Sequence, residues 1–309
     1  MDLGTLHKNI VYKNQGTPYS LTRTITKNGQ PDILFHWHTD VELIYVHEGT
    51  AQFHIDYDYF NSEAGDIILI RPNALHSIHP IENRRHYMDA LNFHLDLMGY
   101  STMDQASIDY LQPLYNGQLD FVHVIKPNQP AYTDIRQCLL DAMKIGYYRT
   151  KYFEFQLKAQ LNQLFYLLFE NGYVISKEQT LEGYRKEEKI RTIIDYISAH
   201  YQEEITIDQL AKICGYSDTH FMNFFKKHLG VSCIEYVIQF RLRKAAELLQ
   251  HSTLPILEIA TQSGFNNLSN FNRQFKKYYQ LTPSQYRKNN KEGFHERYYL
   301  VISTAFHFS

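Results

Sequence analysis

Two histidines and a glutamate near the N-terminus have a spacing suited to metal coordination. They are His36, His38 and Glu42, in a His-x-His-x3-Glu-x6-Gly pattern that ends at Gly49. Residues i and i+2 of a β-strand point to the same face, so the two imidazoles would project together. Two imidazoles and a carboxylate are suitable ligands for a divalent metal ion. The pattern therefore predicts a candidate metal centre.

Two other interpretations of these side chains stay open. They can line a small-molecule pocket as polar groups, or they can be histidines that only support the fold. Aromatic and polar residues nearby favour a pocket suited to a sugar, since rings stack on its apolar faces while polar groups bond its hydroxyls. The predicted pocket residues are His36, Trp37, His38, Glu42, Tyr45, His76 and His94.

The spacing of this first segment resembles the first motif of the cupin family. A second motif should follow, and Gly65, Pro72 and His76 stand in about that place. The sequence departs from the family pattern here, because the glycine expected after the proline is missing and the histidine comes one residue early. The resemblance implies a cupin-like barrel with His76 as a candidate fourth metal ligand. It also leaves open a metal-dependent cupin enzyme that uses the first three ligands.

The C-terminal part of the chain contains a near-duplication. Leu210-Ala211 and Gly215-Tyr216 recur as Ile259-Ala260 and Gly264-Phe265, and Phe225-Lys226-Lys227 recurs as Phe275-Lys276-Lys277. Each copy predicts a short helix, a glycine turn and a second helix, which is the helix-turn-helix pattern. The alanines let the two helices approach closely, and the glycines supply a left-handed turn that a side chain would resist.

Residues from about 187 to 289 resemble the DNA-binding domain of the AraC family of transcription regulators. The resemblance implies two helix-turn-helix units joined by one long helix, here about 233 to 250, with each second helix in the major groove of double-stranded DNA. It also implies a small-molecule effector, often a carbohydrate, and a homodimer formed through sensor helices. The matching segments outside the duplication are Ser217, Ser232, Arg241-Leu242-Arg243-Lys244-Ala245, Phe271 and Leu281-Thr282-Pro283-Ser284-Gln285-Tyr286-Arg287.

The length of the linking helix supports that geometry. A helix of about 18 residues spans about 27 Å, and successive major-groove faces lie about 34 Å apart. One chain can therefore reach two adjacent grooves, with some bending of the DNA.

The buried face of each second helix predicts which side chains face the DNA. Phe221, Phe224 and Phe225 mark the buried face in the first unit, and Phe271 and Phe275 mark it in the second. Arginine reads guanine and asparagine reads adenine, so we expect the second helix to be the better sequence reader. Lysines suit phosphates. The predicted DNA-binding residues are Asp218, Thr219, Met222, Asn223, Lys226, Lys227, Asn267, Ser269, Asn270, Asn272, Arg273, Lys276 and Lys277.

Two changes of residue pattern divide the chain into elements. Strand-like runs with frequent turn signals from about 18 to 125 predict an antiparallel sandwich or barrel. Apolar residues three or four apart then predict two helices, which end near Asn171-Gly172. Further on, Thr206, Ser217, Ser232 and Thr282 are predicted N-caps.

We expect a two-domain fold: an N-terminal all-β cupin-like barrel with appended helices, and a C-terminal all-α domain of two helix-turn-helix units. The predicted boundaries are a cupin-like effector-binding domain at 1–130, a helical connection used for dimerisation at 131–175, a linker at 176–189, the DNA-binding domain at 190–290 and an apolar tail at 291–309.

The charge distribution agrees with this division. The 309 residues carry 31 Lys and Arg against 33 Asp and Glu, a net charge of −2. That total hides two opposite parts, because residues 1–184 carry 14 basic and 21 acidic side chains whereas residues 185–290 carry 15 and 10. The basic part is the part with the repeat, as phosphate binding requires.

Cysteine usage and targeting signals bear on the compartment. Cys138, Cys214 and Cys233 are widely spaced without a Cys-x-x-Cys pair, which argues against a disulfide framework or a cysteine zinc site. The sequence shows no signal-peptide pattern and no apolar run of about 20 residues. We therefore expect a cytoplasmic location and no membrane partner.

These observations predict a ligand-responsive transcription regulator and not an enzyme. Its cofactor, if it has one, would be a divalent metal in the cupin-like domain. A rival interpretation is a constitutive DNA-binding protein whose cupin-like domain is only a dimerisation scaffold.

Overall fold

The structure is a computed structural model that describes residues 18–26, 33–81, 86–177 and 181–293. Within the described chain, contacts define two compact units with their boundary between Arg191 and Thr192. The apolar side chains of the predicted tail, which begin at Phe294, lie outside the described residues.

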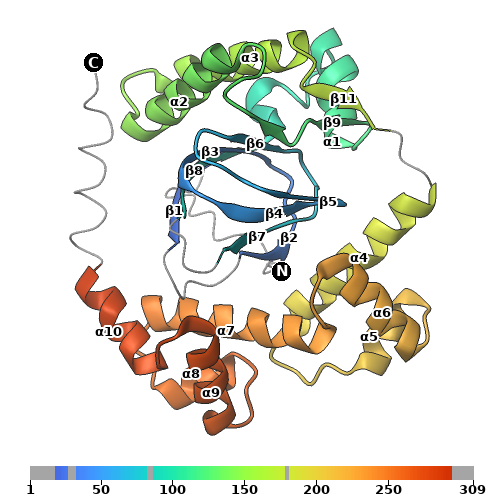
Figure 1. The fold of residues 1–309 in the computed structure, drawn as a ribbon, viewed down its shortest axis with the longest axis vertical. Helices are drawn as coiled ribbons and strands as arrows, with labels where there is room; N and C mark the ends of the chain where they lie inside the picture. The colour runs from blue at the N-terminus through green and yellow to red at the C-terminus, as the bar shows by residue number, and fades with distance from the viewer. Residues whose placement is uncertain (1–17, 27–32, 82–85, 178–180, 294–309) are drawn as a thin grey trace. The chain divides into compact units, whose positions relative to one another are not determined.

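The N-terminal unit is built on antiparallel sheets (Figure 1). The five-stranded sheet has the order β1-β8-β3-β6-β10, the four-stranded sheet has the order β2-β7-β4-β5, and β11 pairs with β9. The strands are β1 (Tyr19–Thr26), β2 (Ile33–His36), β3 (Val41–Gly49), β4 (Ala51–Ile55), β5 (Asp58–Asn61), β6 (Ile67–Ile70), β7 (His76–Pro80), β8 (His86–Phe93), β9 (Leu119–Phe121), β10 (Val124–Ile125) and β11 (Val174–Ser176).

Strand alternation gives the five-stranded sheet two apolar faces. Ile44 and Ile68 on one face pack with Phe53 and Ile78 of the four-stranded sheet. The other face packs in one core with α2 (Tyr132–Tyr148) and α3 (Phe153–Glu170), and Figure 1 shows both helices lying over it. The short helices of this unit are η1 (Leu95–Met98), η2 (Ser107–Leu111) and α1 (Gln112–Tyr115). The predicted cupin-like β domain with appended helices is confirmed.

Helix α4 (Leu181–His200) lies where the sequence suggested a linker. The predicted linker, 176–189, is thus helical from Leu181 onward. Its charged composition reflects a helix with one apolar stripe, since Ile190, Ile193, Ile194 and Ile197 are all buried.

The C-terminal unit consists of helices, as predicted. The helices after α4 are α5 (Ile207–Cys214), α6 (Asp218–Leu229), α7 (Cys233–His251), α8 (Ile256–Gln262), α9 (Leu268–Tyr279) and α10 (Pro283–Gly293). Thr206, Ser217 and Ser232 cap α5, α6 and α7 through their side-chain oxygens, which confirms three predicted caps. Thr282 likewise accepts a hydrogen bond from the amide of Gln285 at 3.3 Å.

The two helix-turn-helix units are α5–α6 and α8–α9, with α7 between them. Their turns contain Gly215 and Gly264 at φ +67° and +82°, as the sequence predicts. The predicted core aromatics are fully buried at Phe221, Phe225, Phe271 and Phe275.

Two further observations concern the cysteines and the helices. The three cysteines are buried free thiols. Among the helices of the described residues, none combines the length and apolarity that a membrane span requires.

Candidate functional site

Four side chains of the N-terminal unit converge in a cluster, here called the histidine cluster: His36, His38, Glu42 and His76. Strand pairing brings them together, because His36 lies opposite His76 between β2 and β7. Glu42 comes from β3, in the other sheet. One ligand atom of each residue lies within 4.8 Å of those of the other three, and all four residues are buried. The ligand set predicted from spacing therefore meets in space, His76 included.

The hydrogen bonds around the three imidazoles leave their Nε2 atoms directed to the centre of the cluster. Each Nδ1 lies within hydrogen-bond distance of a main-chain carbonyl: Leu34 for His36 (2.8 Å), Asp40 for His38 (3.0 Å) and Ala74 for His76 (2.9 Å). In that arrangement Nδ1 carries the proton and donates it to the carbonyl, which leaves a lone pair on Nε2.

Glu42 completes this arrangement. Its Oε2 lies 3.0 Å from Nε2 of His38 and 3.2 Å from Nε2 of His76. The hydrogen bonds from Nδ1 to main-chain carbonyls match those of metal-binding histidines, which donate the ring N–H that faces away from the metal to a carbonyl or carboxylate. Three imidazoles and one carboxylate therefore fit a divalent ion such as zinc, manganese, iron or nickel.

The other predicted pocket residues do not join the histidine cluster. Tyr45 lies three positions after Glu42 on β3, so it points to the opposite face of the sheet. There its hydroxyl accepts a hydrogen bond from Nε of Arg136 at 2.9 Å. His94 lies at the end of β8, where its ring accepts a hydrogen bond from the amide of Asp96 at 3.3 Å. The structure therefore does not bring Tyr45 and His94 into the histidine cluster, and the effector pocket stays a prediction.

Sequence reasoning missed a neighbour of the cluster, Asn92. It is fully buried, pairs with Glu42 across β3 and β8, and places its Nδ2 3.5 Å from Nε2 of His38. The strand pairing is a tertiary feature that no local pattern around Asn92 indicates.

A second buried group of charges joins distant segments of the same unit. Nη2 of Arg71 lies 2.6 Å from a carboxylate oxygen of Asp56, and its Nε lies 3.2 Å from Asp120. Nζ of Lys177 lies 2.8 Å from Asp56 and 3.1 Å from Asp120. We call these four residues the buried ion cluster.

The charges in the buried ion cluster outweigh the effect of burial on Asp56. Burial alone would raise the pKa of Asp56, but the positive charges of Arg71 and Lys177 hold that pKa at about 2. Glu187 on α4 shows the opposite balance, since burial and the charge of Asp56 raise its pKa. The first half of α4 therefore lies in the electrostatic field of this cluster.

Helix α4 also contacts the segment that carries the histidine cluster. The guanidinium of Arg191 lies over the ring of Trp37, 5.8 Å from its centroid, and Trp37 stands between two of the cluster histidines. Arg191 also donates a hydrogen bond to the carbonyl of Asn73. The amide of Asn73 in turn donates to the carbonyl of His38 at 2.7 Å. These contacts join α4 to the main chain at the cluster.

In the C-terminal unit, the residues predicted to face DNA lie on the surface. The buried faces of α6 and α9 point inward, and every predicted DNA-binding residue on these helices is exposed. Lysines close the last turn of each helix, at Lys226, Lys227, Lys276 and Lys277. Both second helices thus offer a polar outer face with a cationic end.

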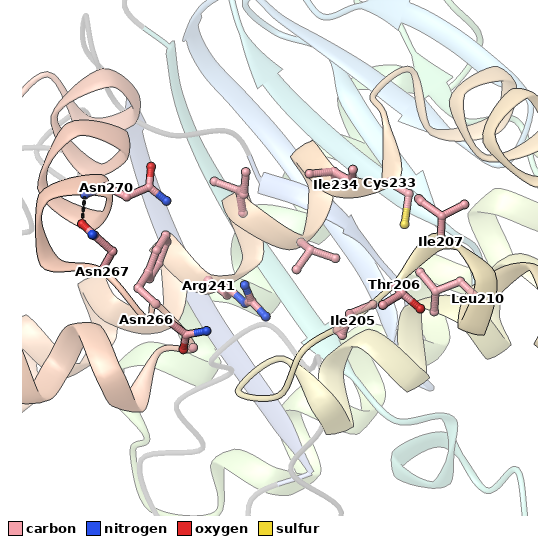
Figure 2. Close-up of a pocket in the computed structure, with 14 residues that line it drawn as sticks. Ile205, Thr206, Ile207, Leu210, Cys233, Ile234, Arg241, Asn266, Asn267 and Asn270 are labelled. Atoms are coloured by element: carbon pink, nitrogen blue, oxygen red, sulfur yellow. Dashed lines mark hydrogen bonds between the residues drawn. The ribbon is translucent and has the colours of Figure 1, made fainter. Parts of the chain in front are cut away.

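Local contacts on α9 order some of these side chains. Oδ1 of Asn267 accepts a hydrogen bond from the amide of Asn270 at 2.9 Å, so Asn267 is the N-cap of the helix (Figure 2). Nη2 of Arg273 donates to Oδ1 of Asn270 at 3.0 Å. Asn270 therefore steadies the guanidinium that is the strongest candidate base reader.

Comparisons with known proteins agree with both units. Residues 23–165 match the family of AraC-like ligand binding domains, and residues 210–289 match a helix-turn-helix domain family. The HTH-type transcriptional regulator YdeC of Bacillus subtilis (strain 168) is 26% identical over 273 residues, which are 86% of this chain and 90% of YdeC.

Two further relatives each match about a third of this chain. The multiple antibiotic resistance protein MarA of Escherichia coli (strain K12) is 31% identical over 104 residues, 34% of this chain and 82% of MarA. The lactose operon transcription activator of Staphylococcus xylosus is 34% identical over 109 residues, 34% of this chain and 39% of that activator.

The fold, the exposed polar helices and these matches define a DNA-binding transcription regulator with a ligand-binding domain. The chain belongs to the AraC family.

Proposed function

We propose that this regulator senses a small molecule in its N-terminal unit and thereby changes how its helix-turn-helix units occupy operator DNA. The observation that carries the proposal is the contact between α4 and the main chain at the histidine cluster. Through Arg191, Trp37 and Asn73, a ligand at the cluster acts on the helix that leads to the DNA-binding unit. A ligand that binds one arrangement of the helix-turn-helix units more tightly than another shifts the population toward that arrangement. The size of the shift is limited by the difference between the two affinities.

We expect Arg273 and Lys227 to contribute differently to DNA binding. Arg273→Ala should reduce discrimination between operator and scrambled DNA by about 1–3 kcal/mol, because a bidentate contact to guanine is lost. Lys227→Ala should weaken binding to all sequences alike and reduce the salt dependence, because a phosphate contact is lost. Binding measured on both DNAs at several salt concentrations separates the two effects.

A matched variant sharpens this test. Arg273→Lys keeps the positive charge but loses the planar fork, so it should lose discrimination while keeping its salt dependence. Equal losses on operator and scrambled DNA for Arg273→Ala would refute a base-reading role.

We propose that the histidine cluster holds one divalent metal ion. Elemental analysis of the purified protein should find about one zinc, manganese, iron or nickel per chain. His76→Ala should lose that metal, and a chelator should lower the melting temperature of the wild type, since an ion that binds only the folded state stabilises it.

His79→Ala is the matched control for the metal. His79 lies on the same strand as His76, but its Nε2 lies 2.9 Å from the hydroxyl of Ser77 and it is not a member of the cluster. This variant should keep the metal content of the wild type. Protein without stoichiometric metal would leave the four side chains as structural or pocket groups.

We propose a carbohydrate as the effector class. Its hydroxyls both donate and accept hydrogen bonds, which suits imidazole and carboxylate groups, and neighbouring hydroxyls can bind a metal ion. One relative, matched over 34% of this chain, is named as the activator of a lactose operon. Because the cluster side chains are at most 2% exposed, a sugar reaches them only after the residues packed around the cluster move apart.

A thermal-shift screen tests the effector class. Mono- and oligosaccharides are added to the protein with and without the metal. At least one sugar should raise the melting temperature of the N-terminal unit, from here on called the sensor unit. A panel without any stabilisation would count against a carbohydrate.

We propose a homodimer formed through α2 and α3. Phe155 and Tyr166 on α3 are 77% and 57% exposed, and Tyr152 just before it is 63% exposed. Large exposed aromatic side chains are enriched in protein interfaces. Sedimentation velocity reads the assembly directly, and a monomer at micromolar concentration would contradict this proposal.

A further inference from the structure

The two helix-turn-helix units meet at a junction of hydrogen bonds around Arg241. This residue lies in the middle of α7. Its Nε donates to the carbonyl of Tyr201 at 2.7 Å, and its Nη2 donates to the carbonyl of Glu203 at 2.6 Å. Both carbonyls belong to the connection that leads from α4 into α5. Arg241 therefore ties the linking helix to the entry of the first unit.

The second unit touches the same connection. Nε2 of Gln202 donates to the carbonyl of Gln262, the last residue of α8, at 2.7 Å. The turn after α8 lies so close that a Cβ on Gly264 would collide with the carbonyl of Tyr201 and come within 2.8 Å of Nε of Arg241. Three segments thus meet at Arg241: the entry of the first unit, the linking helix and the turn of the second unit.

The space beside this junction is a pocket of about 290 Å³. Figure 2 shows Arg241 within it, between the start of α5 and the start of α9. Thr206 and Ile207 line it from the first unit, and Asn266, Asn267 and Asn270 line it from the second. Beside Arg241 a pocket thus lies between the start of α5 and the start of α9, and the hydrogen bonds of Arg241 and Gln202 join the two sides there.

The two halves of α7 belong to different cores. Tyr236 in its first half packs against Phe225 of α6, with ring centroids 5.7 Å apart. Leu242, Ala245 and Leu249 in its second half belong to the core of the second unit. Arg241 lies on α7 between the residues of the first core and those of the second. A bend in α7 at this position would change the distance between α6 and α9.

We propose that Arg241 is a positioning residue that sets which separation of two half-sites the protein accepts on DNA. This proposal rests on DNA binding by both units. A rigid connection makes the second binding event favourable at one separation only, whereas a loose connection spreads that gain over several. Two inserted base pairs move the second half-site by about 7 Å and rotate it by about 70°.

The experiment measures binding of the full-length protein to a set of DNA duplexes. A duplex selected from random DNA by the wild type gives the native spacing, and duplexes with one or two base pairs inserted between the half-sites complete the set. The wild type should lose about 100-fold in affinity on two insertions. Arg241→Gln should lose about tenfold on the native spacing, and its ratio between native and inserted duplexes should fall below about tenfold.

Two further variants and a control keep the test decisive. Gln202→Ala removes the hydrogen bond to Gln262, which is the contact of the junction that Arg241 does not make. We call the affinities over the set of duplexes the spacing profile, and this variant should reduce the differences among them even if Arg241→Gln fails to fold. Arg241→Lys keeps the positive charge and one donor nitrogen, so its preference for the native spacing should lie between that of Arg241→Gln and that of the wild type. Lys244→Ala is the control on the same helix. Nζ of Lys244 donates to Glu247 at 3.0 Å and not to a carbonyl of the connection, so this variant should keep the wild-type ratio between native and inserted duplexes.

Two outcomes would overturn the proposal. One is an Arg241→Gln protein that loses the same factor on every duplex, so that the ratio is unchanged. The other is a wild-type profile for Gln202→Ala and Arg241→Gln alike. A wild type without preference for any selected sequence would instead refute base-specific DNA recognition, so the two failures are distinguishable.

Discussion

Arg71→Ala is expected to lower the free energy of unfolding of the sensor unit by about 3–5 kcal/mol. Removing one partner of a buried ion pair leaves the other charges buried and uncompensated, and this costs several kcal/mol. Asp56 and Asp120 would both lose the guanidinium between them. Trp37 is the single tryptophan of the chain, so denaturant unfolding followed by its fluorescence reports the sensor unit.

Glu63→Gln is the matched control for Arg71→Ala, because it leaves Lys126 in place 3.7 Å from the buried carboxylate of Asp66. Nζ of Lys126 lies 2.7 Å from Glu63, but the two side chains are 41% and 72% exposed. An exposed pair contributes about 0–1 kcal/mol, so this variant should unfold almost as the wild type does. Similar losses in both variants would mean that the buried ion cluster is not a special source of stability.

The pH dependence of the wild type follows from the same contacts. The pKa of Asp56 is about 2 in the folded protein, below its ordinary value of 3.8. A lowered folded-state pKa contributes stability that is present above about pH 4 and is lost as the pH falls toward 2. Part of the stability that the wild type loses between about pH 4 and pH 2 should therefore already be missing in Arg71→Ala.

Phe271→Ala is expected to destabilise the second helix-turn-helix unit by about 3–5 kcal/mol, the usual loss for a buried phenylalanine. Phe271 is fully buried, with its ring centroid 5.1 Å from that of Phe265 and 5.5 Å from that of Phe275. A helix as short as α9 depends on such packing, because isolated helices of about 12 residues are marginal in water. Helical melting by circular dichroism and operator binding should both report the loss.

Two comparisons identify the origin of that effect. Phe271→Leu keeps most of the apolar volume and should show a much smaller loss. The fluorescence transition of Trp37 should not change in either variant, since Trp37 belongs to the other unit. Unchanged helical melting in Phe271→Ala would contradict the role of this ring in the core.

The helix-turn-helix units could be predicted because their signals are local. Short segments contain the caps, the turn glycines and the buried phenylalanines, and the repeat states the pattern twice. Thr206 illustrates this, because its side chain and that of Gln209 form a reciprocal cap only three residues apart. The charged first half of α4 misled the prediction, since composition alone does not separate a linker from an exposed helix.

The candidate site was predictable only in part. The spacing of His36, His38 and Glu42 indicated shared ligands, but Tyr45 was placed with them although an odd separation along a strand puts it on the other face. The buried ion cluster lay beyond sequence reasoning, because Lys177 meets Asp56 across 121 positions. Such contacts depend on the whole fold and leave no local pattern.

The continuity of α4 limits how this regulator can be rebuilt. The helix runs unbroken from Leu181 to His200, and the boundary between the two units falls inside it, after Arg191. Each residue inserted into a helix turns everything beyond it by 100° and moves it by about 1.5 Å. A chimera that joins a foreign sensor within α4 therefore keeps the helical phase only when the insertion or deletion is close to whole turns, such as seven residues.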